Sequence, residues 1–307
     1  MSRVVIVGGG LSGLAAAALL EQQNIDYTLI EVKRRVGGSL ISQSVQGFIF
    51  DGIRSICDAD LPAHPLMATW GLQDALAVVE DGVIFRQGIQ MLVDALSARI
   101  SGPRLMRMAL SSIGELEGGS MALCMENGLM LNARAIILAL PARYAERVFY
   151  GYRSEITEHL LSYQYEPLTS IALGYPYQID RHALPVPTGA SFLRAFHHVE
   201  RGGSIVQVGL ALQRGVLTDA TDLPFYGRWE LPRWDAIFQH HWPEADPLTL
   251  YREDYPAWRD KLMAMIPPRV ALIGSDYVSV PLPRGIAPIS QCLSQAQEAV
   301  KKILNDL

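Results

Sequence analysis

Lysine is scarce in this chain of 307 residues: only Lys33, Lys261, Lys301 and Lys302 are present, so nearly all side-chain cations are arginines. A reaction that depends on a lysine therefore has few positions at which it could be supplied. The 26 basic residues face 31 acidic ones, giving a net charge of −5. No window gathers the basic residues into the stripe that a phosphate backbone requires, which argues against nucleic acid as a partner.

Cysteine is also rare, with Cys57, Cys124 and Cys292 far apart and no Cys-x-x-Cys pair. An odd number at such spacing supports neither a disulfide framework nor a thiolate metal site. We therefore expect a protein of the reducing cytoplasm.

Long apolar runs are missing as well, since Ser12 and Gly13 interrupt the first apolar segment and Glu21 ends it. A membrane span needs about 18 such residues, so we expect neither a transmembrane helix nor a membrane partner. Residues 1–20 could be taken for a signal peptide, but they fit a strand, a turn and a helix better. With 50% hydrophobic residues the chain can bury a large core, and its length suggests two domains.

A glycine-rich turn follows the first apolar run. Val4–Val7 is short and β-branched, which is typical of a strand buried on both faces of a parallel sheet. Residues 8–13 read Gly-Gly-Gly-Leu-Ser-Gly, and apolar residues then recur at helical spacing over 11–19. A second strand over 27–30 ends in Glu31. This order predicts a strand–turn–helix–strand dinucleotide site.

Each residue of this pattern has an expected task. Gly8 permits the tight turn, Gly10 lets the backbone approach a pyrophosphate, and Gly13 allows the helix to pack closely on the strand. The phosphates would sit on the helix N-terminus at Leu11 and Ser12. Glu31 would accept hydrogen bonds from an adenosine ribose and disfavour a 2′-phosphate.

The stretch after the second strand distinguishes an FAD-binding site from an NAD-binding site. It reads Glu-Val-Lys-Arg-Arg-Val-Gly-Gly-Ser-Leu over residues 31–40. The spacing Glu-x-x-x-Arg-x-Gly-Gly resembles the FAD-dependent amine oxidase and protoporphyrinogen oxidase superfamily, which includes renalases and phytoene desaturases. The resemblance implies FAD, with Gly37 and Gly38 passing against the diphosphate and Arg35 offering donors to phosphate. We expect noncovalent attachment, since none of the three cysteines coincides with an evident attachment motif.

Further stretches resemble the same superfamily in order: 47–52, 88–96, 110–113, 135–141, 272–277 and 285–287. In the last two, Asp276 would hold the ribityl chain and the final helix would point its N-terminus at the flavin. The implied FAD site consists of Gly8, Gly10, Leu11, Ser12, Gly13, Glu31, Val32, Arg35, Gly37, Gly38, Ser39, Leu110, Ala139, Pro141, Gly274, Asp276, Gly285, Ile286 and Ala287.

The sequence departs from the superfamily at Ser39, where a second arginine is common, and at Ile53, where a second glycine is common. The short interval from Asp51 to Gly88 leaves no room for the usual helical insert, and such compactness resembles renalases. These departures weaken assignment to any one subfamily but leave FAD binding intact.

The expected fold is α/β, with a Rossmann-like FAD-binding domain made of residues 1–46, 82–143 and 268–307. Residues 47–81 and 144–267 would form a substrate domain with a mixed or antiparallel sheet. Its strand-like runs are Ser170–Tyr175 and Ser204–Leu212, separated by turns such as Leu184–Gly189. By the resemblance, this sheet would cover the flavin ring.

Candidate substrate-contacting residues are few. Arg54 could bind a carboxylate, or it could be a surface or phosphate-binding arginine. Tyr255 and Trp258 precede the closing motif and could lie beside the flavin or in the core.

Two other patterns are better explained by strand geometry and packing than by a functional site. Adjacent histidines at 197–198 and 240–241 would point to opposite faces of a strand, so we expect no metal site. The alternating tyrosines 163, 165, 175 and 177 suggest sheet packing more than an aromatic cage.

The predicted function is an FAD-dependent oxidoreductase that oxidises a small organic donor by hydride transfer to flavin N5. Dioxygen or another acceptor would restore the cofactor. Amine oxidases of the superfamily usually place a lysine near N5, and no lysine occurs between Lys33 and Lys261. The alternatives are a renalase-like oxidase of dihydronicotinamide species and a non-catalytic FAD-binding accessory protein.

Overall fold

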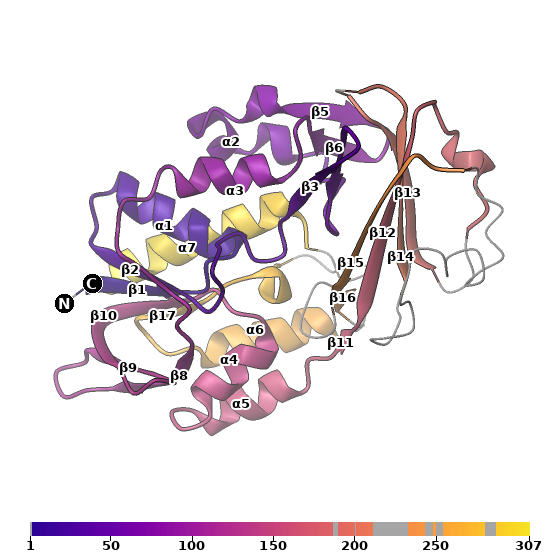
Figure 1. Cartoon of the computed structure of the whole chain (residues 1–307). Coiled ribbons are helices and arrows are strands. Elements are labelled where there is room, and N and C mark those ends of the chain that lie inside the picture. Colours follow the sequence, from indigo (N-terminus) through magenta and orange to yellow (C-terminus); the bar gives the residue numbers. More distant parts are fainter. Residues whose placement is uncertain are drawn as a thin grey trace. The chain divides into compact units, whose positions relative to one another are not determined.

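The computed structural model describes residues 2–186, 190–199, 201–210, 233–242, 248–249, 254–279 and 287–307. The chain divides into two compact units (Figure 1). Unit 1 comprises Met1–Gly38, Leu92–Gln164 and Thr249–Leu307, and unit 2 comprises Ser39–Met91 and Tyr165–Leu248.

Unit 1 is built on a sheet whose central strands are parallel. The strand order is β7 (Arg104–Met106), β2 (Tyr27–Glu31), β1 (Ser2–Val7), β10 (Met130–Leu138), β9 (Met121–Met125) and β8 (Leu110–Glu115), with β17 (Val270–Leu272) also paired to β10. β1 runs parallel to both β2 and β10, and β10 runs parallel to β17. β8, β9 and the first half of β10 form an antiparallel meander.

Helices cover the two faces of this sheet. In Figure 1, α1 (Leu11–Gln22) and α7 (Ile289–Asn305) lie together on one side, and α4 (Ala142–Phe149), α5 (Ser154–Leu161) and α6 (Tyr255–Met265) gather on the other. Residues Leu11–Leu20 of α1 are all buried, so this helix has no solvent-facing side over its first ten residues. The strand–helix–strand order predicted for residues 4–31 is confirmed.

Unit 2 contains a four-stranded antiparallel sheet, which confirms the predicted sheet. Its order is β13 (Ala190–His197), β14 (Ser204–Leu210), β12 (Leu168–Tyr175) and β15 (Ala236–Trp242). Two hairpins precede it in the chain: β3 (Ser42–Val45) with β4 (Phe48–Asp51), and β5 (Leu76–Val79) with β6 (Gly82–Phe85).

The remaining elements are short. They are α2 (Pro65–Thr69), α3 (Gln90–Ser97), the two-residue strands β11 (Tyr165–Glu166) and β16 (Leu248–Thr249), and 3-10 turns at Leu61–Ala63, Gln73–Ala75, Arg181–Ala183 and Ser275–Tyr277. The last residues of the predicted strand 204–212 and of the predicted turn 184–189 lie outside the described residues.

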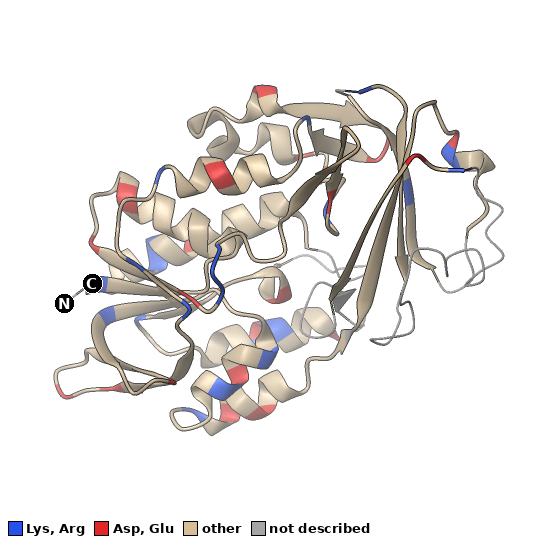
Figure 2. Cartoon of the chain, viewed as in Figure 1, with Lys and Arg blue, Asp and Glu red and all other residues tan. Residues whose placement is uncertain are grey.

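The two faces of the unit 2 sheet bury separate apolar clusters. One contains Ile171, Leu173, Tyr175, Val206, Val208 and Leu210. The other contains Phe48, Phe50, Ala172, Ile205, Ala236 and Phe238. In Figure 2 the described strands of this sheet are almost entirely tan, because Arg194 is their single Lys, Arg, Asp or Glu residue.

Four segments fall in the other unit from the one predicted: residues 39–46 and 82–91 are in unit 2, and residues 144–164 and 249–267 are in unit 1. We expected residues 144–164 in the substrate domain, but they belong to unit 1 because α4 packs on β8 and α5 packs on α4 and α6. We expected residues 82–91 with the FAD-binding domain, but they fall in unit 2, where β6 pairs with β5.

The tyrosine alternation is not one sheet pattern. Tyr175 lies in β12, and its ring centroid is 5.8 Å from that of Tyr177. Tyr163 instead packs against Trp258 in unit 1, with ring centroids 4.9 Å apart. The prediction of sheet packing therefore fails for Tyr163, because the chain leaves unit 1 between these tyrosines.

Asp51 at the end of β4 ties the first hairpin of unit 2 to the residues before α3. Its Oδ1 accepts the Ser42 hydroxyl at 2.5 Å and the Ile89 N–H at 2.9 Å, and the Ser42 Oγ accepts the Gln90 N–H at 2.9 Å. Burial raises the pKa of Asp51 to about 7, although both hydrogen bonds act in the opposite direction.

This pKa predicts a pH-dependent effect of Asp51→Asn. An unfolded chain loses the Asp51 proton near pH 4, whereas the folded protein keeps it to about pH 7, so the wild type loses stability as pH rises through that window. The free energy of unfolding of Asp51→Asn minus that of the wild type should rise by roughly 2 to 4 kcal/mol between pH 4 and pH 8. Urea unfolding at several pH values measures this difference, and a constant value would contradict the prediction.

Candidate functional site

Four neighbouring parallel strands of unit 1 end at one edge of the sheet. β2, β1, β10 and β17 end at Glu31, Val7, Leu138 and Leu272. Hydrogen bonds continue past those ends: Gly8 N–H to Ile30 O at 2.8 Å, Ala139 N–H to Val7 O at 2.7 Å, and Ile273 N–H to Leu138 O at 2.9 Å. The turns that follow these strands therefore leave the same edge, where open α/β sheets bind ligands.

The turn between β1 and α1 is possible only with glycine at two positions. Gly8 has φ +104°, and a Cβ there would overlap the Ala139 carbonyl oxygen. A Cβ on Gly13 would overlap the Gly8 carbonyl oxygen. Gly8 and Gly13 are therefore required by the fold itself, as the sequence predicted.

Gly10 is different, because none of the described residues requires a glycine there. Its φ is −72°, which any residue can adopt, and the nearest atom to an added Cβ is Gly38 Cα at 3.9 Å. Gly37 N–H donates to Gly9 O at 2.7 Å and holds the second glycine loop beside this turn. The lack of a side chain at Gly10, at the N-terminus of α1, is what the close approach of a bound phosphate would need.

Glu31 lies directly beside this turn. Its side chain is 6% exposed, with Oε2 accepting the Gly9 N–H at 2.6 Å and Oε1 accepting the Lys33 N–H at 2.7 Å. The carboxylate is therefore held in place by backbone donors. Met108 N–H donates to Glu31 O at 3.0 Å, which brings the start of β8 at Leu110 close to the same strand end.

Arg35 and Val32 occupy the loop that follows. The Arg35 guanidinium donates to Val36 O at 3.1 Å and to Gly38 O at 2.9 Å, so it braces the Gly37–Gly38 loop. Burial lowers the pKa of Arg35, and Glu31 partly offsets this effect. Val32 is 60% exposed. A phosphate contact by Arg35 stays a prediction, as does a role for Ser39, which begins unit 2.

Asp276 connects the turn after β17 with the start of α4. It is 4% exposed, and its Oδ2 accepts the Ala142 N–H at 2.8 Å. α4 follows Ala139 and Pro141, and it has no side-chain cap or acidic residue in its own first turn. Asp276 therefore supplies the negative charge that a helix N-terminus favours. Its predicted ribityl contact is a separate matter and stays a prediction.

The last two predicted stretches, 272–277 and 285–287, are only partly within the described residues. Gly274 has φ +140°, which requires glycine. Ala287 is buried immediately before α7. Gly285 and Ile286 lie outside the described residues.

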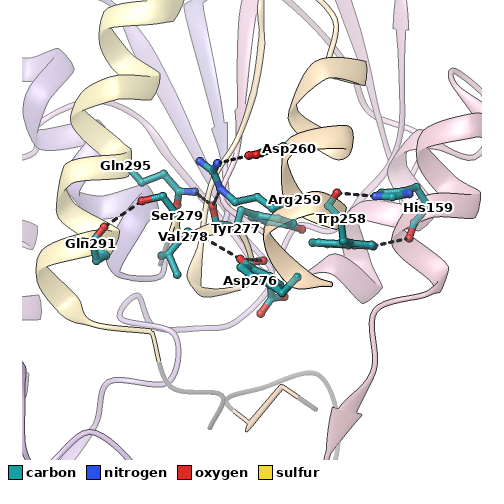
Figure 3. Close-up of polar contacts among 11 residues, drawn as sticks. His159, Trp258, Arg259, Asp260, Asp276, Tyr277, Val278, Ser279, Gln291 and Gln295 are labelled. Carbon is teal, nitrogen blue, oxygen red and sulfur yellow. Dashed lines mark hydrogen bonds and ion pairs between the residues drawn. The ribbon is translucent and has the colours of Figure 1, made fainter. Parts of the chain in front are cut away.

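Tyr255 and Trp258 of α6 are both buried, and Figure 3 shows Trp258 beside His159. The Tyr255 Oη lies 2.8 Å from Asp276 O and 2.9 Å from Val278 O. Trp258 Nε1 donates to Ser162 Oγ at 2.9 Å, and the indole stacks on His159 with centroids 5.2 Å apart. These contacts support the core alternative for both residues and join α6 to the turn after β17 and to α5.

Arg54 lies in unit 2 and is 7% exposed. The segment that carries it is fastened to three strands of the sheet. Arg194 donates to Ile53 O at 3.1 Å, Ser55 Oγ donates to Gln207 Oε1 at 2.8 Å, and Ser170 Oγ donates to Gly52 O at 3.0 Å.

Sequence reasoning missed Ser170, Arg194 and Gln207. A signal was present, because each is a polar residue inside a strand made mostly of apolar residues.

The histidine pairs have other partners. His241 Nδ1 lies 2.8 Å from Thr169 Oγ1, and His198 Nε2 accepts the Ile49 N–H at 3.0 Å. Within the described ranges, His, Cys, Asp and Glu side chains form no group that could hold a metal ion. Helices of the described part of the chain are all too short or too polar to cross a bilayer.

The fold and the sheet-edge turns are those of a Rossmann-like domain. Residues 6–69 match the family described as NAD(P)-binding Rossmann-like domain. Over the whole chain, the structure resembles the crystal structure of a putative protoporphyrinogen oxidase from Exiguobacterium sp. 255-15, with a TM-score of 0.78, 12% identity and coverage of 100% of this chain and 99% of that one. A redesigned triple mutant of putrescine oxidase gives a TM-score of 0.74 at 12% identity, again over 100% and 99%.

The sequence relatives point to the same superfamily. Protoporphyrinogen oxidase 2 of Arabidopsis thaliana is 38% identical over 73 residues, which is 24% of this chain and 14% of that protein. Flavin-containing amine oxidase A of Canis lupus familiaris is 50% identical over 38 residues, 12% of this chain and 7% of that protein. The chain thus matches a small part of the length of these relatives. Its likeness to the FAD-dependent amine oxidase and protoporphyrinogen oxidase superfamily is confirmed.

The contrast between Gly10 and Gly13 gives a prediction. Gly10→Ala should fold with nearly unchanged stability but bind the dinucleotide at least tenfold more weakly, since the new methyl group enters the ligand's space. Gly13→Ala should instead lower the free energy of unfolding by several kcal/mol, because its Cβ overlaps backbone. Thermal melting of apoprotein and titration with FAD separate the two effects. Equal loss of stability in both variants would contradict this assignment.

Proposed function

We propose that this chain binds FAD noncovalently and is an oxidoreductase that oxidises a small organic donor by hydride transfer to flavin N5. The observation that carries the proposal is the glycine turn at the N-terminus of α1, where Gly9 N–H binds Glu31 and an added Cβ on Gly10 would meet, among the described residues, just Gly38 Cα at 3.9 Å. The likeness to oxidases in both fold and sequence supports the same chemistry.

FAD fits these residues better than a nicotinamide dinucleotide. A second glycine pair, Gly37 and Gly38, lies against the phosphate turn, and Arg35 keeps that loop in shape. Glu31 is positioned for the hydroxyls of an adenosine ribose and opposes a 2′-phosphate. Noncovalent attachment is consistent with the burial of Cys57 and Cys292.

FAD supplies the redox chemistry when bound, because its ring accepts a hydride from the donor. The protein then has three tasks: binding the adenosine through Glu31, binding the phosphates at the start of α1, and fixing the ribityl side through the turn after β17. None of these tasks needs a proton-transferring side chain, provided that the donor releases hydride readily.

The positions of the four lysines favour such donors. Lys33 is exposed next to Glu31, and Lys261 and Lys301 are exposed on α6 and α7. Lys302 Nζ donates to Val270 O at the amino end of β17, the opposite end of that strand from the turns. Unit 2 contains no lysine. A lysine close to the flavin is therefore not available from these positions.

Glu31→Gln should weaken FAD binding by about ten- to a hundredfold. The amide keeps the shape of the side chain but loses the negative charge, and a charge-assisted hydrogen bond contributes roughly 1.5 to 3 kcal/mol. Titration of apoprotein with FAD measures the effect, with the exposed Glu117→Gln as a matched control. An unchanged dissociation constant would mean that another group holds the ribose.

Donors that gain conjugation on oxidation should reduce the enzyme fastest. In anaerobic stopped-flow experiments we expect a dihydropyrrole, a dihydropyridine or reduced nicotinamide to bleach the flavin much faster than benzylamine or a polyamine. Rapid reduction by a simple amine that is abolished in Lys261→Met would overturn the argument from lysine positions.

The same stopped-flow experiment also tests the two alternative functions. A marked preference for reduced nicotinamides supports a renalase-like oxidase of dihydronicotinamide species. Tight FAD binding without bleaching by any of these donors supports an accessory protein that holds FAD without turnover.

A further inference from the structure

The turn after β17, Gly274–Val278, is fastened by one side chain at both ends. Gly274 N–H donates to Gln295 Oε1 at 2.8 Å. Gln295 Nε2 donates to Tyr277 O at 2.7 Å (Figure 3). A single amide of α7 thus spans the turn and uses both its acceptor and its donor.

The position of this amide is unusual for its helix. Gln295 is 9% exposed, and its buried neighbours on α7 include Cys292, Leu293, Ala296 and Ala299. Burying an amide costs free energy unless its hydrogen bonds are made, so an apolar residue would pack at this position more easily. The two bonds to the turn are what this glutamine provides.

α6 holds the same turn from another element. Arg259 Nε donates to Tyr277 O at 2.8 Å, and the Tyr255 Oη lies between the carbonyls of Asp276 and Val278. Burial raises the pKa of Tyr255, so its hydroxyl stays a donor. Three consecutive carbonyls and the Gly274 N–H of this turn are thus hydrogen-bonded, and from it the Asp276 carboxylate accepts the Ala142 N–H.

The strand order assigns this turn to the flavin half of the ligand. The phosphates would lie at the end of β1 and the adenosine ribose at the end of β2, on one side of β1. β10 and β17 follow on the other side of β1, and two strand spacings of about 4.8 Å place the turn roughly 10 Å beyond β1. A ligand that extends from β2 across β1 therefore continues toward Asp276.

We propose that Gln295 is a positioning residue for the flavin half of bound FAD, acting through the Gly274–Val278 turn. This inference rests on the proposed function. It distinguishes Gln295 from Glu31, which would act on the adenosine half.

The test compares two probes, FAD and ADP, because ADP carries only the adenosine half. In apoprotein titrations, Gln295→Met should weaken FAD by about ten- to a hundredfold, as expected for the loss of two hydrogen bonds, and leave ADP affinity within twofold of the wild type. Glu31→Gln should weaken both probes. Gln297→Met makes the same chemical change at a half-buried position of α7, and it should change neither affinity.

A second variant gives a signature that general packing would not produce. Gln295→Glu keeps the acceptor for Gly274 N–H, but it can donate to Tyr277 O only when protonated. Its FAD affinity should therefore increase as pH falls from 8 to 5, relative to the wild type, and its flavin absorption spectrum should move toward that of the wild type.

Each outcome separates the hypotheses. Equal weakening of FAD and ADP by Gln295→Met, or no weakening of either, overturns the positioning role. A pH-independent difference between Gln295→Glu and the wild type does the same if Gln295→Met fails to fold. Wild-type apoprotein that binds neither FAD nor ADP overturns the proposed function itself.

Discussion

The close approach of α1 to the end of β1 is the constraint on which the rest of unit 1 depends. Side chains at Gly8 or Gly13 would overlap the carbonyl oxygens of Ala139 and Gly8. Without this contact α1 could not begin at Leu11 directly after the turn whose Gly9 N–H binds Glu31. The same contact sets β10 next to β1, and through β10 it determines where β17 and its turn lie.

The N-terminal site could be predicted because its information is local. A buried strand, a glycine turn, a helix and an acid follow one another within residues 4–31, and each has a known periodicity or backbone requirement. The antiparallel sheet of unit 2 could likewise be predicted from apolar strand runs bounded by turn residues.

The rest depends on contacts between distant residues that no local pattern encodes. Asp276 and Ala142 are 134 positions apart, and nothing in either neighbourhood indicates that one caps the helix of the other. Tyr255 and Trp258 were recognised as aromatic residues near the closing motif, but the sequence could not decide between flavin and core. Domain boundaries were misplaced for a similar reason, because the packing of α4 on β8 is invisible in the order of residues.

Burial of α1 on every side has a consequence for how the protein assembles. One flank of this helix packs against β1 and β2, and another packs against α7, which is made of residues 289–305. During synthesis the apolar residues on that flank of α1 therefore stay uncovered until residues 289–305 have been made. Contacts of such large sequence separation slow folding and leave hydrophobic surface open to aggregation or chaperone binding in the meantime.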